Sequence, residues 1–310
     1  MKVFELTKKA YLRYITYPID KIVNTLIWVF TPKSKIIVVN GFIKHRGDKI
    51  RPTNFGDDLN YVLVKALSRK RVVSYRYSYI SWFKPDNYMC IGSIVDYLAN
   101  SNSIIWGGGA IGFKNKKGIK PKCIYAVRGT KTRDYYLEMG INCPEIYGDP
   151  ALLLPLIYNS SRSKRYKIGI IPHIVDLNNK FVSKFKKEMG KECVVIDLKN
   201  YRNWRDVVDC IKDCEIIASS SLHGLILSDA YNIPNVWIKL SNNIIGNDFK
   251  FYDYFSGCSR DDTIWIDYRN HEIKYDELLS SSKRWKPINY DKDKLLASCP
   301  FLSKDFITDI

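Results

Sequence analysis

Short apolar runs alternate with amphipathic stretches along most of this chain, a pattern typical of α/β proteins with parallel sheets. In the first half, the apolar runs predict strands at residues 35–40, 71–75, 88–91, 103–106 and 122–127. Apolar residues at helical spacing predict helices around residues 59–67, 94–99 and 130–139. Gly140 suits the end of the last of these helices, because glycine readily adopts the left-handed conformation found there.

The second half repeats the alternation. Strands are predicted at residues 167–171, 193–198, 215–218 and 235–238, and helices near 178–189, 204–212, 222–231 and 249–255. Between the halves, Pro150, Pro155 and an Asn-Ser-Ser-Arg-Ser tract interrupt regular structure. The predicted fold class is α/β, with two Rossmann-like domains facing each other across a cleft. We divide the chain into an N-terminal segment (1–34), a first domain (35–155) and a second domain with a C-terminal tail (156–310).

Length and composition agree with two globular domains. A chain of 310 residues exceeds one ordinary core, and 46% hydrophobic residues are ample for two. The eight cysteines include no Cys-x-x-Cys pair, which argues against a zinc site. Scattered, unpaired cysteines are typical of a reducing compartment, so we expect a cytoplasmic protein.

The net charge of +17 indicates an anionic partner and is concentrated near the N-terminus. Residues 1–56 carry eleven Lys or Arg against three Asp or Glu, a net +8. Within the basic and aromatic segment 1–34, the longest nearly apolar run is the nine residues 22–30, too short to span a bilayer. Pro18 and Asp20 interrupt the segment and argue against a signal peptide.

Two interpretations of segment 1–34 stay open. It lies in an anionic membrane interface, peripheral on the inner face of the cytoplasmic membrane, or it forms a helix packed on the domain with its lysines solvated. No nucleic-acid recognition module is found, so no nucleic-acid partner is expected.

The stretch from Cys214 to Pro234 is the most informative. It predicts a strand, a serine loop and a helix that begins near Leu222, with Ser220 or Ser221 as the N-cap. His223 then falls in the first helical turn, where free N–H groups, the helix dipole and an imidazole converge on an anion. A histidine there can bind phosphate or move a proton near neutral pH.

Other residues follow predicted strands. Arg128 ends one strand just before a helix, and its guanidinium matches carboxylate or phosphate geometry. His173 follows another strand, with a role in the cleft or in a structural turn equally open. Gly107, Gly108 and Gly109 permit close backbone approach to a ligand, although a tight turn explains them as well. We interpret His45 and His271, which have charged neighbours, as surface residues.

The turn from Asn54 to Asp57 is the last candidate. The carboxylate of Asp57 either caps the following helix or lies on the substrate side of the cleft. Taken in order, the Asn-x-Gly-Asp turn at 54–57, the glycine run at 107–109, Arg128-Gly-x-x-Thr132, Gly148-Asp-Pro-Ala-Leu and Ser221-Leu-His-Gly resemble the polysaccharide pyruvyl transferase family. The resemblance covers about residues 35–245.

This resemblance implies two domains arranged as in GT-B glycosyltransferases, phosphoenolpyruvate as donor substrate, no cofactor and no metal. It implies a hexose or N-acetylhexosamine acceptor, often lipid-linked, in capsule or exopolysaccharide biosynthesis. Arg128 would bind the donor, and His223 would contact it and transfer a proton. The substrate-binding set would further include Asn54, Ser220, Ser221, Gly224 and His173, with Gly107 to Gly109.

One position departs from the family pattern. Some members have arginine immediately before the Leu-His pair, where this chain has Ser221. The donor phosphate then depends on backbone N–H groups, on Ser220 and Ser221, or on an arginine or lysine from elsewhere. We assign His223 as the acid and Asp57 as a base or as a group that positions the acceptor.

Two rival functions fit the same sequence. One is a GT-B glycosyltransferase that uses a nucleotide sugar. No acidic residue is clearly placed to hold the ribose of the nucleotide, and Glu192 and Asp197 stay open for that role. The other is a non-catalytic relative that binds a membrane surface or a glycan, which Ser221 would suit.

Overall fold

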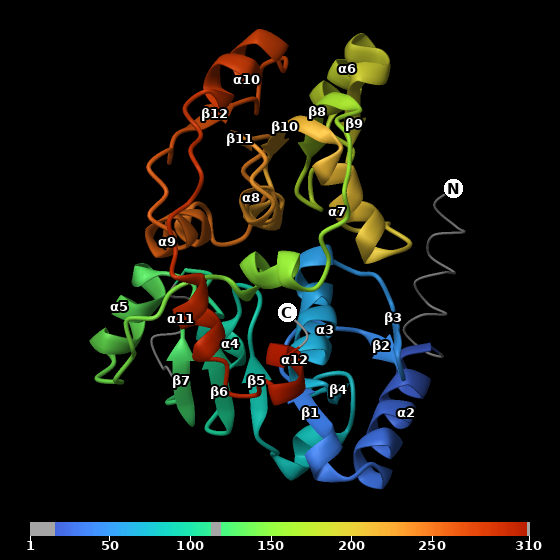
Figure 1. Cartoon of the computed structure of the whole chain (residues 1–310), viewed down its shortest axis with the longest axis vertical. Coiled ribbons are helices and arrows are strands. Elements are labelled where there is room, and N and C mark those ends of the chain that lie inside the picture. The colour runs from blue at the N-terminus through green and yellow to red at the C-terminus, as the bar shows by residue number, and fades with distance from the viewer. Residues whose placement is uncertain (1–15, 113–118, 309–310) are drawn as a thin grey trace.

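The protein consists of two α/β domains, each built on a parallel five-stranded sheet (Figure 1). The structure is a computed structural model and is described for residues 16–112 and 119–308. The first sheet has the strand order β4-β1-β5-β6-β7 and the second the order β12-β11-β10-β8-β9. All neighbouring strands within the two sheets run parallel. The α/β class is therefore confirmed, with two sheets as two Rossmann-like domains require.

The first sheet follows the predicted apolar runs closely. Its strands are β1 (Ile36–Val39), β4 (Arg71–Ser74), β5 (Asn87–Met89), β6 (Ser103–Trp106) and β7 (Cys123–Ala126). The helices of this part are α2 (Tyr17–Phe30), α3 (Phe55–Ser68), α4 (Val95–Leu98) and α5 (Thr130–Glu138). All four residues of β1 are buried, as expected for a parallel strand covered on both faces.

The second sheet is built from β8 (Tyr166–Ile171), β9 (Cys193–Val195), β10 (Cys214–Ser219), β11 (Asn235–Lys239) and β12 (Trp265–Asp267). Its helices are α6 (Lys180–Met189), α7 (Trp204–Lys212), α8 (Leu222–Ala230), α9 (Phe249–Gly257) and α10 (Tyr275–Ser282). Side-chain oxygens of Asn179 and Asn203 accept hydrogen bonds from the first turns of α6 and α7 and fix where these helices begin.

A buried connector holds the two halves together. The 3₁₀ helix η4 (Pro150–Leu156) packs against both α3 and α8, and Ala151 to Leu154 are buried. One apolar cluster includes Leu59 of the first half and Leu225 of the second. The junction between the sheets is thus a packed core rather than a flexible hinge.

The end of the chain returns to the first sheet. Helices α11 (Lys292–Ala297) and α12 (Lys304–Thr308) lie beside the first domain in Figure 1. The indole of Trp106 donates to the backbone oxygen of Leu295, and Phe301 packs edge-on against Trp106. The C-terminal tail, which we assigned to the second domain from the sequence, thus crosses back over the first domain.

Several features differ from the predictions or were not predicted. A small antiparallel hairpin of β2 (His45–Arg46) and β3 (Lys49–Ile50) and the short strand β12 lack long apolar runs. His45 is buried rather than at the surface: Nε2 accepts from the N–H of Ser74, and burial lowers the pKa of the ring.

None of the helices in the described part of the chain combines the length and hydrophobicity needed to cross a bilayer.

Candidate functional site

His223 lies where the two domains meet. It is the second residue of α8, directly beyond the carboxyl end of β10. A Cβ atom built on Gly56, in the first turn of α3, would be 1.9 Å from the Nδ1 of His223, so the imidazole rests on bare backbone of the other domain. Nε2 is buried and has no hydrogen-bond partner in the structure as described. The ring is therefore fixed in place with one nitrogen available.

The charge of this imidazole is set by its surroundings. Burial, reinforced by the positive charges of Lys250 and Arg128, lowers the pKa of His223 to about 3. The ring is neutral at pH 7. An anion bound beside it would offset those positive charges and raise the pKa again, so the protonation of His223 is coupled to ligand binding.

Asp57 extends from the same turn of α3 as Gly56. Its Oδ2 accepts from the side-chain amide of Asn54 (2.8 Å), and a Cβ on Gly92 would lie 3.5 Å from its Oδ1. Burial and the neighbouring carboxylate of Asp58 raise the pKa of Asp57 to about 7, against the attraction of Lys250. A half-buried carboxyl group poised near neutral pH suits proton transfer.

Lys250, in the first turn of α9, is the residue that sequence reasoning missed. Only 9% of it is exposed, and burial together with the charge of Arg128 lowers the pKa of its ammonium to about 8. Within the described residues, the ammonium has no hydrogen-bond or ion-pair acceptor, and its recorded contact is with the ring of Phe251 at 5.6 Å. The charge of Asp57 attracts this cation from beyond ion-pair distance, and a nearly buried cation without a closer acceptor is costly unless an anion joins it. The available signal was a lysine between two aromatic residues, Phe249 and Phe251, in an otherwise apolar turn.

Arg128 forms a buried ion pair across the domain junction. Its Nε donates to Oδ2 of Asp253 in α9 (2.9 Å), and both side chains are fully buried. The other two guanidinium nitrogens donate to Oγ of Ser93 and to the backbone oxygen of Ala110. The charge of Arg128 acts on His223 and Lys250, whereas its N–H groups point at protein atoms. Direct contact between Arg128 and a donor stays a prediction.

The Arg128-Gly-x-x-Thr132 motif has a clear structural role. The N–H and Oγ1 of Thr132 each donate to Asp253 at 2.8 Å, so a carboxylate of the second domain caps helix α5 of the first. A Cβ on Gly129 would lie 1.6 Å from the backbone oxygen of Asp253. The motif thus fastens α5 to α9 and thereby positions Lys250.

The serine loop before α8 joins His173 to the same region. Ser220 Oγ accepts from the N–H of His173 (2.8 Å), and Ser219 Oγ accepts from the N–H of Ser221 (3.0 Å). Burial and Lys250 lower the pKa of His173 to about 3. Ser221 is the N-cap of α8 but makes no side-chain capping bond, so its hydroxyl is not used by the helix. A Cβ on Gly224 would lie 2.2 Å from Ser219 Oγ, which explains this glycine by packing.

The glycine run after β6 is enclosed. Gly107 has φ = +82°, and a Cβ there would lie 2.3 Å from Pro150; a Cβ on Gly109 would lie 2.2 Å from the guanidinium carbon of Arg128. Gly108 is packed against Val95. These residues make room for Pro150 and Arg128, and their contact with a ligand stays a prediction.

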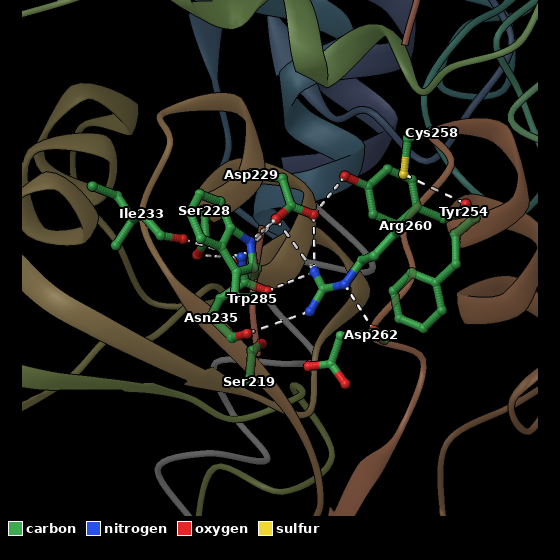
Figure 2. Close-up of polar contacts among 12 residues, drawn as sticks. Ser219, Ser228, Asp229, Ile233, Asn235, Tyr254, Cys258, Arg260, Asp262 and Trp285 are labelled. Atoms are coloured by element: carbon green, nitrogen blue, oxygen red, sulfur yellow. Dashed lines mark hydrogen bonds and ion pairs between the residues drawn. The ribbon is translucent and has the colours of Figure 1, made fainter. Parts of the chain in front are cut away.

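A second buried ion pair fixes the other ends of α8 and α9 (Figure 2). Asp229, at the end of α8, accepts from Arg260 (3.0 Å), from the hydroxyl of Tyr254 in α9 (2.8 Å) and from the indole of Trp285 (2.8 Å). Asn235 of β11 donates to the same carboxylate. The helices that carry His223 and Lys250 are thereby tied to one another.

A groove of about 1030 Å³ opens on another side of the junction, between α3 and the start of α7. Its lining is strongly basic and partly aromatic: Lys49, Lys65, Arg69, Lys70, Arg71, Arg202 and Arg205, with Tyr61, Tyr201 and Trp204. The hydroxyl of Tyr201 donates to Oδ2 of Asp58 (2.7 Å), next to Asp57. The groove therefore borders the turn that holds the Asp57 carboxylate.

Comparison with known proteins places this arrangement in a family. A relative from Acanthamoeba polyphaga mimivirus, an uncharacterized protein, is 30% identical over 222 residues, which cover 68% of this chain and 74% of the relative. The sequence profile of polysaccharide pyruvyl transferases matches residues 54–242, which begin at the Asn54 turn and include Arg128, His173 and His223. The chain therefore belongs to the polysaccharide pyruvyl transferase family.

Proposed function

We propose that this protein transfers the enolpyruvyl unit of phosphoenolpyruvate to two hydroxyls of a sugar and forms a pyruvate ketal. The observation that carries the proposal is a pair of groups at the domain junction: the ammonium of Lys250, a residue that is only 9% exposed, and the buried, unpartnered Nε2 of His223. A small, highly charged anion satisfies both at once. Phosphoenolpyruvate, with close to three negative charges, is such an anion.

In this proposal Lys250 supplies the cation that some family members would supply with an arginine at the position of Ser221. Lys250 pairs with the phosphate or carboxylate of the donor. The hydroxyl of Ser221, which makes no capping bond to α8, and the N–H groups opening α8 add hydrogen bonds. Arg128 contributes through its charge and by holding α9 in place.

His223 acts as the acid. The incoming anion raises the pKa of the imidazole, so the ring gains a proton when the donor binds. His223 then protonates the methylene carbon of the donor, and a sugar hydroxyl attacks the cationic carbon that results. Phosphate leaves and a neighbouring hydroxyl closes the ketal. One hydroxyl proton restores the acid, and the other passes through Asp57 to the departing phosphate.

Asp57 acts as the base for a sugar hydroxyl. A carboxyl group with a pKa of about 7 is substantially ionised at neutral pH and takes up a proton readily. The acceptor saccharide approaches from the basic and aromatic groove beside Asp58, in a GT-B-like arrangement of the two domains. Aromatic rings such as Tyr201 and Trp204 offer flat apolar faces to sugar rings. The setting we propose is capsule or exopolysaccharide biosynthesis.

The rival glycosyltransferase reaction has weaker support. Oxygen atoms of Asp197 accept from the N–H groups of Lys199 and Asn200 in its own turn, and Glu192 pairs with Lys167 at the surface. Neither carboxylate is free to hold a ribose. Phosphoenolpyruvate should therefore raise the melting temperature of the protein, whereas UDP-sugars should not.

The test of function is a reaction. The purified full chain is incubated with phosphoenolpyruvate and a panel of free and lipid-linked saccharides, and both released phosphate and product mass are followed. We expect acceptor-dependent phosphate release with a product that carries one added carboxyethylidene group. Glycan or membrane binding without phosphate release from any acceptor would favour a non-catalytic relative.

A further inference from the structure

The fully buried residues of helix α2 are polar, whereas the side chains on its exposed face are apolar. Ile27 and Trp28 are partly buried against the first domain. The residues of α2 that are buried are Asp20 and Asn24. Asp20 pairs with Arg46 and Arg51, and the amide of Asn24 donates to the backbone oxygen of His45. The opposite face, at a spacing of three or four residues, exposes Ile19, Ile22, Leu26, Val29 and Phe30, with 42–79% of each side chain accessible. This reverses the usual arrangement of a surface helix.

A second, distant segment extends this apolar surface. The 3₁₀ helix η3 (Ile80–Phe83) exposes Trp82 (79%) and Phe83 (66%), and Phe83 stacks on Trp28 of α2 with ring centroids 5.5 Å apart. Exposed apolar residues of η3 therefore lie next to α2, although the two segments are fifty residues or more apart in the chain. We call these exposed residues of α2 and η3 the α2 patch. Exposed apolar side chains gathered on neighbouring elements mark an interaction site.

The charges around the α2 patch point to its partner. Lys33, Lys35 and Lys84 are exposed beside it, and Lys33 lies over the ring of Trp28 at 3.3 Å. Across α2, η3 and the short 3₁₀ helix η2 (Lys33–Lys35), the single acidic residue is Asp20, which is buried. Residues 1–15 lie outside the described part of the chain, and their sequence adds Lys2, Lys8, Lys9 and Arg13 against Glu5. Apolar and aromatic residues ringed by lysines fit an anionic lipid surface, with the aromatic rings at headgroup level.

We propose that the α2 patch lies in the interface of an anionic membrane and anchors the protein peripherally. Figure 1 places α2 at the end of the first domain remote from the second domain. Membrane contact through α2 therefore leaves the domain junction, with His223 and Lys250, uncovered. This inference does not depend on the proposed reaction, because its evidence lies outside that site.

The test is sedimentation of the full chain with vesicles of phosphatidylcholine alone or mixed with phosphatidylglycerol. We expect the chain to bind the anionic vesicles, and we expect this binding to weaken as salt is added. The variant Leu26→Ser/Phe30→Ser/Trp82→Ser should bind at least 10-fold more weakly, because it loses apolar area that enters the lipid. The matched control is Ile264→Ser, which removes a residue that is 64% exposed on the second domain, and it should bind as the parent does.

Other results would overturn the proposal. If the full chain ignores anionic vesicles and is dimeric in light scattering, a second copy covers the α2 patch. If the chain does not bind the vesicles and is monomeric, the α2 patch is not a membrane site. Residues 1–15 of the same chain are then the next candidate to cover it. Equal vesicle binding by the triple variant and the control would show that charge alone, and not this patch, holds the lipid.

Discussion

The imidazole of His223 rests directly on the backbone of Gly56, so that a methyl group at residue 56 would lie 1.9 Å from its Nδ1. The two residues come from different domains, and each opens a helix: Gly56 lies in the first turn of α3 and His223 in the first turn of α8. The Asn-x-Gly-Asp and Ser-Leu-His-Gly motifs are thus two sides of one contact. The imidazole can lie against the turn that carries Asp57 because the residue between Phe55 and Asp57 has no side chain.

Gly56→Ala should therefore cost activity while the fold is retained. The added methyl group must push the imidazole aside, and a displacement of about 1 Å at a reacting group can lower a rate about 10²-fold. The control is Gly41→Ala, because a Cβ at that position meets its nearest neighbour at an ordinary 3.8 Å. Phosphate release and the melting temperature of both variants check this. A fully active Gly56→Ala enzyme would contradict the placement of His223.

Asp253→Asn should be strongly destabilising. The substitution leaves the guanidinium of Arg128 charged and fully buried, which typically costs about 3–5 kcal/mol. Asp267→Asn, which breaks a surface pair with Arg269, should change the free energy of unfolding little. Urea denaturation of both variants measures the difference. Equal, small effects would mean that Arg128 does not lock the domains together.

The sequence predicted most of the fold because its strands are short, continuous apolar runs and its helices follow them at regular spacing. The first turn of α8, with His223, was predicted correctly for the same reason. Lys250 was not, because its role depends on α9 crossing to the first domain, and the Arg128–Asp253 pair that brings it there joins residues 125 positions apart. The packing of α2 could not be predicted from the sequence pattern either. Its buried polar residues bind groups in and beside the β2–β3 hairpin, and this hairpin has no apolar run that would have predicted it.

Asp57→Asn should stabilise the protein at neutral and alkaline pH but not in acid. Burial raises the pKa of this carboxyl from 3.8 to about 7 in the folded state, so the folded protein holds the proton more tightly than the unfolded chain does. The resulting penalty is absent below pH 4, grows as pH rises towards 7 and is constant above it. Denaturation midpoints measured from pH 4 to pH 9 test this. A stability difference between variant and parent that is independent of pH would mean that Asp57 is an ordinary, solvated carboxylate.

The pH dependence of kcat should be bell-shaped, because kcat reports the complex in which the donor has already raised the pKa of His223. On the acid side activity rises as Asp57 ionises, and on the alkaline side it falls as Lys250 loses its proton. Lys250→Arg should keep the acid limb and shift the alkaline limb to higher pH, because a guanidinium stays charged. An unchanged alkaline limb in this variant would assign that limb to another group.

The most direct test of the central claim, that Lys250 and His223 together hold a small polyanion at the domain junction, is calorimetric titration of phosphoenolpyruvate into the parent protein, Lys250→Met and Lys274→Met. Lys274 is an exposed lysine of the second domain and serves as the control. We predict one site in the parent, unchanged affinity in Lys274→Met and binding weakened about 10–100-fold in Lys250→Met, the equivalent of one lost charge-assisted hydrogen bond. Equal affinity in all three proteins, or no binding to the parent, would contradict the claim.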